Sequence, residues 1–333
     1  MGLERPAAKP LDALQAYLAA DMTEVNALIR ERMASEHAPR IPEVTAHLVE
    51  AGGKRLRPLL TLAAARLLGY EGPWHVHLAA TVEFIHTATL LHDDVVDESR
   101  QRRGRPTANL LWDNKSSVLV GDYLFARAFQ LMVEPGSMRV LDILASASAT
   151  IAEGEVLQLT AAQDLRTTVA IYLQVIRGKT AALFAAAAEA GAEIAGGDAG
   201  QVAALRDYGD ALGIAFQIVD DLLDYGGSTR EIGKNVGDDF RERKVTLPVI
   251  LAHARGDEAE RAFWRRVIEK GDQRDGDLDE ALRLMARHQA LEETRRAALG
   301  WAGHAQAALA PLPDHPVRAM LHDLAGYVVA RVR

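Results

Sequence analysis

The chain has no cysteine, and this absence removes several classes of chemistry. Without thiols it can form no disulfide, hold no zinc–thiolate or cysteine-ligated iron–sulfur centre, and use no thiol nucleophile. A protein that does without disulfides suits a reducing compartment, so we expect it in the cytoplasm.

Aromatic residues are also scarce, at 5% of the chain, although hydrophobic residues make up 49%. Alternating strand-like patterns are nowhere sustained, and helical spacing of apolar residues dominates. Frequent alanine with few aromatics indicates helices that pack closely on small side chains. The sequence therefore predicts an all-α fold, with helices over 11–34, 42–51, 55–69, 74–98, 116–133, 137–163, 165–190, 198–225, 243–255, 257–270, 277–289, 291–309 and 315–332.

The charge balance and the lack of long apolar stretches restrict the partners. A net charge of −8, from 46 acidic and 38 basic residues, argues against a general nucleic-acid surface. The N-terminus has no apolar core of a signal peptide, and no uncharged apolar stretch is long enough to cross a bilayer, so we expect no transmembrane segment. No linker divides the chain. We expect one domain over 1–333, with 1–10 as a flexible N-terminal segment.

Two aspartate motifs of one pattern stand out: DDVVD, which begins at Asp93, and DDLLD, which begins at Asp220. In a helix, residues four apart lie on one face, so Asp93 with Asp97 and Asp220 with Asp224 form two pairs of carboxylates. An isolated motif of this kind is most simply an acidic helix face. Two copies in apolar sequence are different, because uncompensated carboxylates would be costly to bury there.

Carboxylate pairs of this kind favour hard divalent cations. Mg²⁺ is usually held by one or two carboxylates while substrate phosphates and water complete its coordination. Both motifs are predicted near the C-terminal ends of helices, where the helix dipole adds negative charge and makes cation binding more favourable. The two motifs together indicate Mg²⁺ bound to a diphosphate.

Three basic clusters accompany the aspartates. GGKRLRP at 52–58 carries Lys54 and Arg57 after a glycine pair, which fits a phosphate site or a solvated helix start equally well. RQRRGRP at 100–106 follows the first motif, and IGKNVGDDFRERK at 232–244 follows the second. Salt bridges alone do not account for so many cations beside the first motif. A ligand with several negative charges accounts for both signs, and its candidate partners here are Arg102, Arg103, Lys234 and Lys244.

Other candidates lie within helices. Gly178 disfavours a regular helix and is expected to mark a kink that aims Lys179 and Thr180 into a cavity. His86 shares a helix face with Asp93, which makes a substrate contact as plausible as an ordinary core histidine. Gln217 shares a face with Asp220 in the same way. A P-loop is rejected at GKT 178–180, because no glycine stands at the required upstream position.

These residues resemble the trans-type polyprenyl diphosphate synthases, over most of the chain. The resemblance implies an all-helical bundle of the isoprenoid synthase type around a deep central cavity, assembled as a homodimer. The matching strings are GGKRLRP from 52, FIHTATLLHDDVVDES with RRG at 102–104, AEGEVLQL at 152–159, GKTAALF at 178–184, FQIVDDLLDY at 216–225 and GKNVGDDFRERKVTLP ending at 248.

The implied reaction is sequential head-to-tail addition of isopentenyl diphosphate to an allylic diphosphate primer, with Mg²⁺ as cofactor. By the resemblance, a first group of residues holds Mg²⁺ on the allylic diphosphate, a second surrounds that diphosphate and a third binds isopentenyl diphosphate. The first is Asp93, Asp97 and Asp220; the second is Arg102, Lys179, Thr180, Gln217 and Lys234; the third is Lys54, Arg57, His86 and Arg103.

Two departures from the family pattern concern arginines. Arg243 stands where family members commonly carry glycine, so the loop before Lys244 is expected to have altered geometry or a fourth phosphate contact. Arg100 adds a cation ahead of the usual arginine pair.

Other functions share parts of this pattern. A terpene cyclase usually replaces the second aspartate motif, and neither it nor a squalene- or phytoene-type synthase needs the GGKRLRP site. A non-catalytic partner subunit is expected to lack part of one motif, whereas this chain has both.

Product length depends on residues one helical turn before Asp93. These are Ala88 and Thr89, where short-chain members tend to have bulky aromatics. The interpretation is a long-chain product, octaprenyl to decaprenyl diphosphate, used for a quinone side chain. Close helix packing explains the small residues equally well, and a farnesyl or geranylgeranyl synthase is the shorter-chain alternative. Deeper blocking residues are sought at Leu131, Met132 and 141–151.

Overall fold

A computed structural model describes residues 9–50, 52–102, 104–226 and 236–330. Within these ranges the regular secondary structure is helical apart from one two-stranded hairpin, which confirms the predicted all-α class. The chain divides into two compact units. Unit 1 comprises Met1–Ser148, Leu183–Gly209 and Ala308–Tyr327, and unit 2 comprises Ala149–Ala182, Asp210–Ala307 and Val328–Arg333. The expected single domain over 1–333 stays a prediction.

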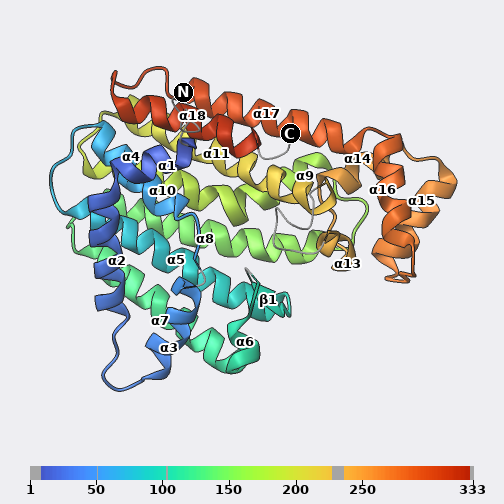
Figure 1. The fold of residues 1–333 in the computed structure, drawn as a ribbon, viewed down its shortest axis with the longest axis horizontal. Coiled ribbons are helices and arrows are strands. Elements are labelled where there is room, and N and C mark those ends of the chain that lie inside the picture. The colour runs from blue at the N-terminus through green and yellow to red at the C-terminus, as the bar shows by residue number, and fades with distance from the viewer. Residues whose placement is uncertain (1–8, 51, 103, 227–235, 331–333) are drawn as a thin grey trace, which may run out of the picture. The chain divides into compact units, whose positions relative to one another are not determined.

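Unit 1 is built around one long helix, α5 (Trp74–Val96), which packs against α7 (Asn114–Val133), α4 (Leu56–Leu67) and α2 (Ala19–Met33). Figure 1 shows α5 and α7 running side by side. The remaining elements of the unit are α1 (Pro10–Tyr17), α3 (Arg40–Glu50), β1 (Gln101–Arg102), β2 (Arg105–Pro106), α6 (Ala108–Leu111) and most of α18 (Pro316–Ala330).

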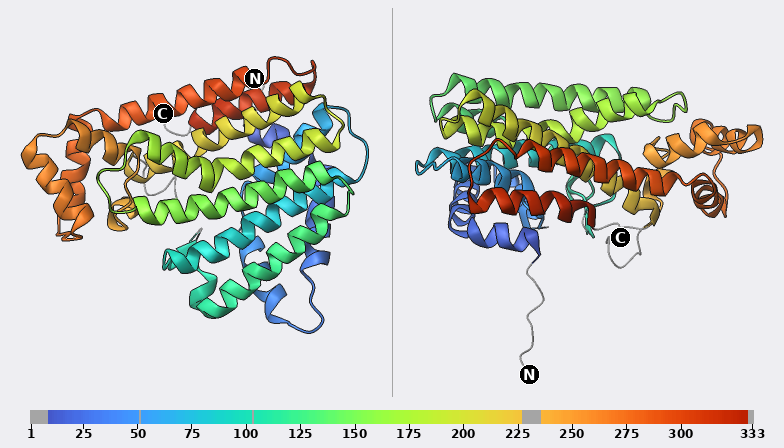
Figure 2. Two further views of the ribbon diagram at one scale, coloured as in Figure 1. Left: turned by 180° about the vertical axis from the view of Figure 1, so that it is seen from behind. Right: turned by 90° about the horizontal axis from the view of Figure 1, so that it is seen from above.

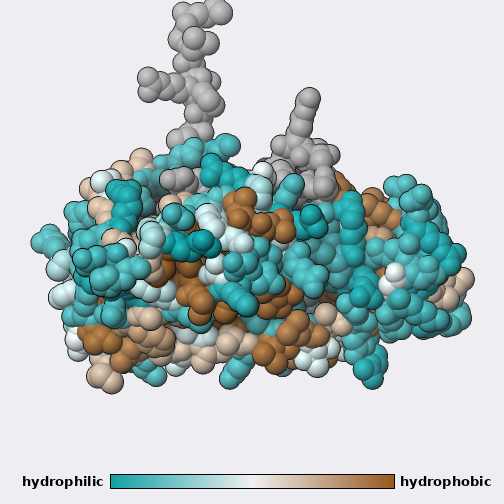
Figure 3. Space-filling view, turned by 90° about the horizontal axis from the view of Figure 1, so that it is seen from below, coloured by the Kyte–Doolittle hydropathy of each residue, from teal (hydrophilic) through white to brown (hydrophobic). Residues whose placement is uncertain are grey.

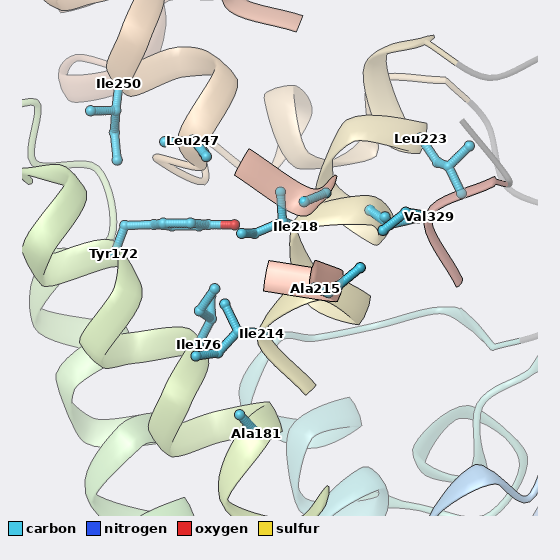
Figure 4. Packing of buried hydrophobic residues seen from close by; sticks show 13 residues of the cluster. Tyr172, Ile176, Ala181, Ile214, Ala215, Ile218, Leu223, Leu247, Ile250 and Val329 are labelled. Carbon is cyan, nitrogen blue, oxygen red and sulfur yellow. The ribbon is translucent and has the colours of Figure 1, made fainter. Parts of the chain in front are cut away.

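Unit 2 holds two buried apolar clusters. One surrounds Tyr172 and Ile218 (Figure 4), and the other surrounds Trp264 and Phe240. Figure 2 shows the helices of this unit from two further sides. Its elements are α9 (Val169–Ile176), η1 (Arg177–Ala181), α13 (Asp238–Arg241), α14 (Leu247–Arg255), α15 (Glu258–Trp264), η2 (Arg265–Glu269), α16 (Asp277–Arg287) and α17 (Ala290–Ala308). Residues of α8 (Met138–Ala161), α10 (Ala182–Ile194) and α11 (Ala199–Gly226) occur in both units.

Most predicted helices are present, and the differences have local causes. The helix expected over 11–34 is interrupted at Leu18, where the backbone leaves helical geometry without a proline or glycine to signal it. The run expected over 165–190 begins only at Val169 and contains a π-helical turn, η1. The hairpin β1–β2 and the short α6 were not predicted. Of the segment expected to be flexible, 1–8 lies outside the described residues, and α1 already begins at Pro10.

One helical run is long and apolar enough to cross a membrane, by length and composition only. The sequence analysis expected no transmembrane segment. The run is Val169–Ile194, comprising α9, η1 and α10. The core helix of a soluble protein passes the same test, and side chains such as Tyr172, Ile176 and Phe184 are buried inside their units. Burial of this kind is what a core helix requires.

Close helix packing in unit 1 depends on Gly191 of α10. A Cβ built there would lie 2.3 Å from the Thr61 carbonyl oxygen of α4 and 3.0 Å from the Ala64 Cβ. Both α4 residues are fully buried and cannot move aside without disturbing the core. The alanine-rich composition is therefore matched by backbones that approach each other directly.

We expect Gly191→Ala to destabilise the protein by about 1–3 kcal/mol, because the added methyl group overpacks this contact. Gly300→Ala on α17 is the matched control, since nothing lies within 4 Å of its Cβ position. That change should stabilise by about 0.4–1 kcal/mol through the unfolded state. Chemical denaturation of both variants measures the difference, and equal stabilities would show that α10 and α4 can separate at no cost.

Candidate active site

The first aspartate motif lies where α5 ends. Val96 is the last helical residue, and the backbone N–H of Asp97 donates to the Asp93 carbonyl at 2.8 Å. Asp93 and Asp97 are both half-buried, whereas Asp94 is completely buried. The predicted pair of carboxylates on one face is therefore present, at the negative end of a helix dipole.

Asp94 is held by the hairpin that follows the motif. Arg102 on β1 donates from Nε at 2.9 Å and from Nη2 at 2.8 Å to the same carboxylate oxygen, Oδ1. Burial raises the pKa of Asp94, and the Arg102 guanidinium opposes that rise. Asn109 also donates to the Asp94 carbonyl, at 3.3 Å. The second residue of the motif thus anchors the basic loop, and Arg103 lies outside the described residues.

Three of the four residues expected to bind isopentenyl diphosphate are described, and they lie on α4, on α5 and in the segment before α4. Arg57 Nη1 is 3.2 Å from His86 Nε2, and its guanidinium lies 4.5 Å over the Phe184 ring. Lys54 is exposed. Arg55, which the sequence analysis did not single out, forms an ion pair with Glu83. Arg57 and His86 are therefore brought together as the sequence predicted.

The expected chain-length residues lie one turn before the first motif. Ala88 is completely buried, and the half-buried Thr89 donates its hydroxyl to the His86 carbonyl at 2.8 Å. Leu131 and Met132 on α7 are also completely buried. Ala88 thus lies in the interior of unit 1, where the size of its side chain affects the packing around it.

The second aspartate motif lies near the end of α11, and its three carboxylates differ in exposure. Asp220 is half-buried, while Asp221 and Asp224 are only 5% and 8% exposed. Asp224 Oδ2 accepts from the backbone N–H of Asp239 at 3.0 Å, and its carbonyl accepts from Gly237 at 2.8 Å. The expected pairing of Asp220 with Asp224 is therefore altered, because Asp224 fastens the segment that leads into α13.

Asp221 takes part in a hydrogen-bonded chain of side chains. Tyr172 donates to its Oδ2 at 2.6 Å, and Gln217 Nε2 donates to its Oδ1 at 2.7 Å. Thr180 in turn donates to Gln217 Oε1 at 2.8 Å. Burial raises the pKa of Asp221 to about 6, although the hydrogen bonds from Tyr172 and Gln217 favour its charged form. Tyr172 is a residue that the sequence analysis missed, because it lies outside every motif.

Lys179 and Thr180 lie on the π-helical turn η1, at the position where Gly178 predicted a kink. A Cβ at Gly154 of α8 would lie 2.6 Å from the Lys179 nitrogen, and one at Gly178 would lie 2.9 Å from the Gly154 Cα. The two glycines let α8 and η1 touch through their backbones. Lys179 Nζ lies 2.8 Å from Glu155 Oε2, within the AEGEVLQL string, so Glu155 is a second residue that the sequence analysis passed over.

The third basic cluster is only partly described. Lys244 lies 2.6 Å from Glu242 and 3.7 Å from Asp239, and Lys234 lies outside the described residues. Arg243 has φ of 59°, a left-handed conformation that favours glycine. Its guanidinium lies beside Gly271, 2.7 Å from where a Cβ would be. Glycine, which the family resemblance led us to expect here, would adopt this conformation without strain, and the position beside Gly271 does not favour the fourth phosphate contact.

The carboxylates fit a divalent metal that is shared with a ligand. Among the residues in the described ranges, no three His, Cys, Asp or Glu side chains gather closely enough to hold a metal ion by themselves. Hard oxygen ligands are nevertheless present, in groups of fewer than three, at Asp93, Asp97 and Asp220. One or two carboxylates are the usual protein ligands of a Mg²⁺ site that substrate phosphates complete.

An all-α fold with two aspartate motifs, each associated with basic side chains, defines a metal-dependent enzyme class that acts on diphosphates. The family described as Polyprenyl synthetase matches residues 38–285, and the chain belongs to this family. The resemblance inferred from the sequence, the fold class and the enzyme class are thereby confirmed.

Known relatives cover almost the whole chain. The crystal structure of a decaprenyl diphosphate synthase from Rhodobacter capsulatus is 77% identical, with a TM-score of 0.95, over 97% of this chain and 100% of that one. A polyprenyl synthase from Caulobacter crescentus is 53% identical, with a TM-score of 0.93, over 99% of this chain and 100% of that one. An octaprenyl diphosphate synthase from Escherichia coli strain K12 is 47% identical over 97% of this chain and 99% of its own length.

We expect Arg102→Leu to destabilise the fold by about 2 kcal/mol or more, because it leaves the buried Asp94 carboxylate without its cation. Adding Asp94→Asn should recover part of that loss, since a neutral amide needs no countercharge. Arg105→Leu is the control, because Arg105 pairs with Arg102 across the hairpin and is exposed. Thermal denaturation measures all four proteins; no recovery in the double variant would show that the ion pair does not stabilise the hairpin.

Proposed function

We propose that this chain elongates an allylic diphosphate by sequential head-to-tail condensation with isopentenyl diphosphate and releases a long-chain all-trans polyprenyl diphosphate. The observation that carries the proposal is the pair of complete aspartate motifs, each with half-buried carboxylates beside basic side chains. The relatives support it, since proteins 47% and 77% identical are described as octaprenyl and decaprenyl diphosphate synthases.

We assign Asp93, Asp97 and Asp220 as ligands of Mg²⁺. Their support is partial exposure, whereas Asp94, Asp221 and Asp224 are buried. Bound Mg²⁺ would neutralise negative charge that develops on the departing diphosphate. The Caulobacter crescentus relative is described as complexed with calcium and isoprenyl diphosphate, so a divalent ion accompanies such a ligand in that protein.

The remaining charged residues divide into two substrate subsites. Lys54, Arg57, His86 and Arg103 bind isopentenyl diphosphate, and the adjacency of Arg57 and His86 supports this assignment. The allylic diphosphate is held by side chains that stabilise charge on the leaving group. Because the diphosphate can accept the proton lost after condensation, no strong protein base is needed. The allylic group comprises Arg102, Lys179, Thr180, Gln217 and Lys234, with Lys244 beside it.

Small residues beneath the first motif support a long product. The growing chain extends along α5 away from Asp93, past Ala88 and Thr89, where no bulky side chain stands. The names of relatives agree: those named geranylgeranyl synthases are 27–32% identical, below the octaprenyl and decaprenyl synthases.

The enzyme acts as a homodimer in this proposal. Large hydrophobic side chains are exposed on α7 and at the start of α8, and a contiguous exposed apolar patch is typical of an interaction surface. Seen from below, hydrophobic surface emerges in several patches (Figure 3). The exposed residues are Val118, Leu119, Phe129, Val133 and Met138.

The absence of cysteine supports the predicted cytoplasmic location.

Incubation with Mg²⁺, isopentenyl diphosphate and an allylic primer, followed by chromatography of the dephosphorylated products, tests the reaction. We expect Asp93→Asn and Asp220→Asn each to lower kcat by about 100-fold or more, because each removes stabilisation of the leaving group. Asp207→Asn, an exposed residue of α11, is the control for loss of one carboxylate. Activity within a few-fold of wild type in either motif variant, or in the presence of a chelator, would contradict the metal assignment.

Product length tests the role of the α5 positions. Thr89→Phe and Ala88→Phe should shorten the product while condensation continues, because an aromatic ring blocks the path along α5. Thr89→Ser is the control, since it keeps the hydroxyl that donates to His86 and adds no bulk. The same chromatography measures the length. Unchanged products from folded, active Phe variants would place the elongation path elsewhere.

A further inference from the structure

We propose that Tyr172 is a positioning residue for the allylic diphosphate subsite, acting through Asp221 and Gln217. The inference rests on the proposed function and adds a residue that no motif contains. The Tyr172 hydroxyl begins the chain of hydrogen bonds that ends at Thr180 on η1.

The position of the hydroxyl is unusual for a residue in an apolar core. Tyr172 is 3% exposed and packs among aliphatic side chains such as Ile218 and Leu247. Figure 4 shows its ring extending from α9 with the hydroxyl directed toward Ile218 of α11. A phenylalanine would supply the same packing, and burying a hydroxyl is unfavourable unless it is hydrogen-bonded. The bond to Asp221 is therefore the reason for a hydroxyl here.

The hydroxyl can only act as a donor to this carboxylate. Burial and the neighbouring Asp221 raise the pKa of Tyr172, so it keeps its proton. Asp221 accepts one bond on each oxygen, from Tyr172 and from Gln217. Both oxygens of Asp221 thus accept from protein donors, so the second aspartate of the motif can orient the side chains of Tyr172 and Gln217.

The carboxylate in turn orients the Gln217 amide. An amide has two donors on nitrogen and an acceptor oxygen, and its two ends are distinguished only by their partners. Here the nitrogen faces Asp221 and the oxygen accepts from Thr180. The second N–H of the same nitrogen is the donor that Gln217 can offer to a phosphate oxygen. Loss of the Tyr172 hydroxyl removes one of the two hydrogen bonds that hold the Asp221 carboxylate. The carboxylate, and the Gln217 amide bonded to it, can then rotate.

Tyr172→Phe tests the inference because it removes the hydroxyl and keeps the ring. The Michaelis constants for the allylic primer and for isopentenyl diphosphate are measured separately, with kcat and the melting temperature. We expect the constant for the primer to rise about tenfold, the effect of one hydrogen bond to a charged group, and the constant for isopentenyl diphosphate to change less than about threefold.

Tyr208→Phe is the matched control. Tyr208 is completely buried, and its hydroxyl donates at 2.7 Å to the Leu321 carbonyl in unit 1 rather than to a residue of either aspartate motif. The Tyr208→Phe variant loses an equivalent buried hydrogen bond. We expect its melting temperature to fall, and the Michaelis constants for the two substrates to change equally or not at all. If Tyr172→Phe behaves as Tyr208→Phe does, or affects both substrates equally, the hydroxyl is structural only and the inference is wrong.

A double variant shows whether the effect passes through Gln217. If it does, adding Tyr172→Phe to Gln217→Met should raise the primer constant no further, because the linked residues act as one unit; additive effects would overturn the inference. Should Tyr172→Phe fail to fold, Thr180→Val and Asp221→Asn probe the same chain, and equal effects on both substrates would overturn it. A wild-type enzyme that forms no product from any primer would instead refute the proposed function, and the inference with it.

Discussion

The structure depends on satisfying carboxylates that lie inside apolar helical sequence. A buried carboxylate without donors is too unfavourable to persist, so each one dictates where a partner must be. Asp94 requires Arg102, which holds the hairpin after α5 against that helix. Asp221 requires Tyr172 and Gln217, and Asp224 requires the backbone N–H of Asp239 in α13. The segments that carry basic residues are thereby fastened to the helices that carry the aspartates.

The same constraint separates two roles within one motif. In each unit the aspartate that begins the motif stays half-buried, and its immediate neighbour is buried and bonded to protein donors. Residues adjacent in a helix point about 100° apart, so one of the pair faces the interior when the other does not. Asp93 and Asp220 are consequently suited to bind metal, while Asp94 and Asp221 fix the surrounding side chains.

A second constraint is the distance between neighbouring helices. Small residues at the contacts allow the helices to approach closely. Gly154 and Gly178 allow α8 to touch η1 through the backbone, and the π-helical turn there carries Lys179 and Thr180. A π-turn inserts an extra residue into a helix and changes the direction of the side chains on it, and such turns recur at functional sites. Helix packing and the placement of Lys179 and Thr180 therefore have one origin.

The sequence by itself determined the all-α class, most helix positions, the two aspartate motifs and the kink at Gly178, because apolar periodicity and residue chemistry are local properties. The resemblance of the motifs to a known family likewise predicted Asp93 and Asp220 as metal ligands, a role that stays a prediction. Only the tertiary structure showed that Asp224 is tied to the backbone of Asp239 and that Tyr172 reaches Asp221. Such partners lie many residues apart, and a local pattern carries no information on which distant donor a buried carboxylate will meet.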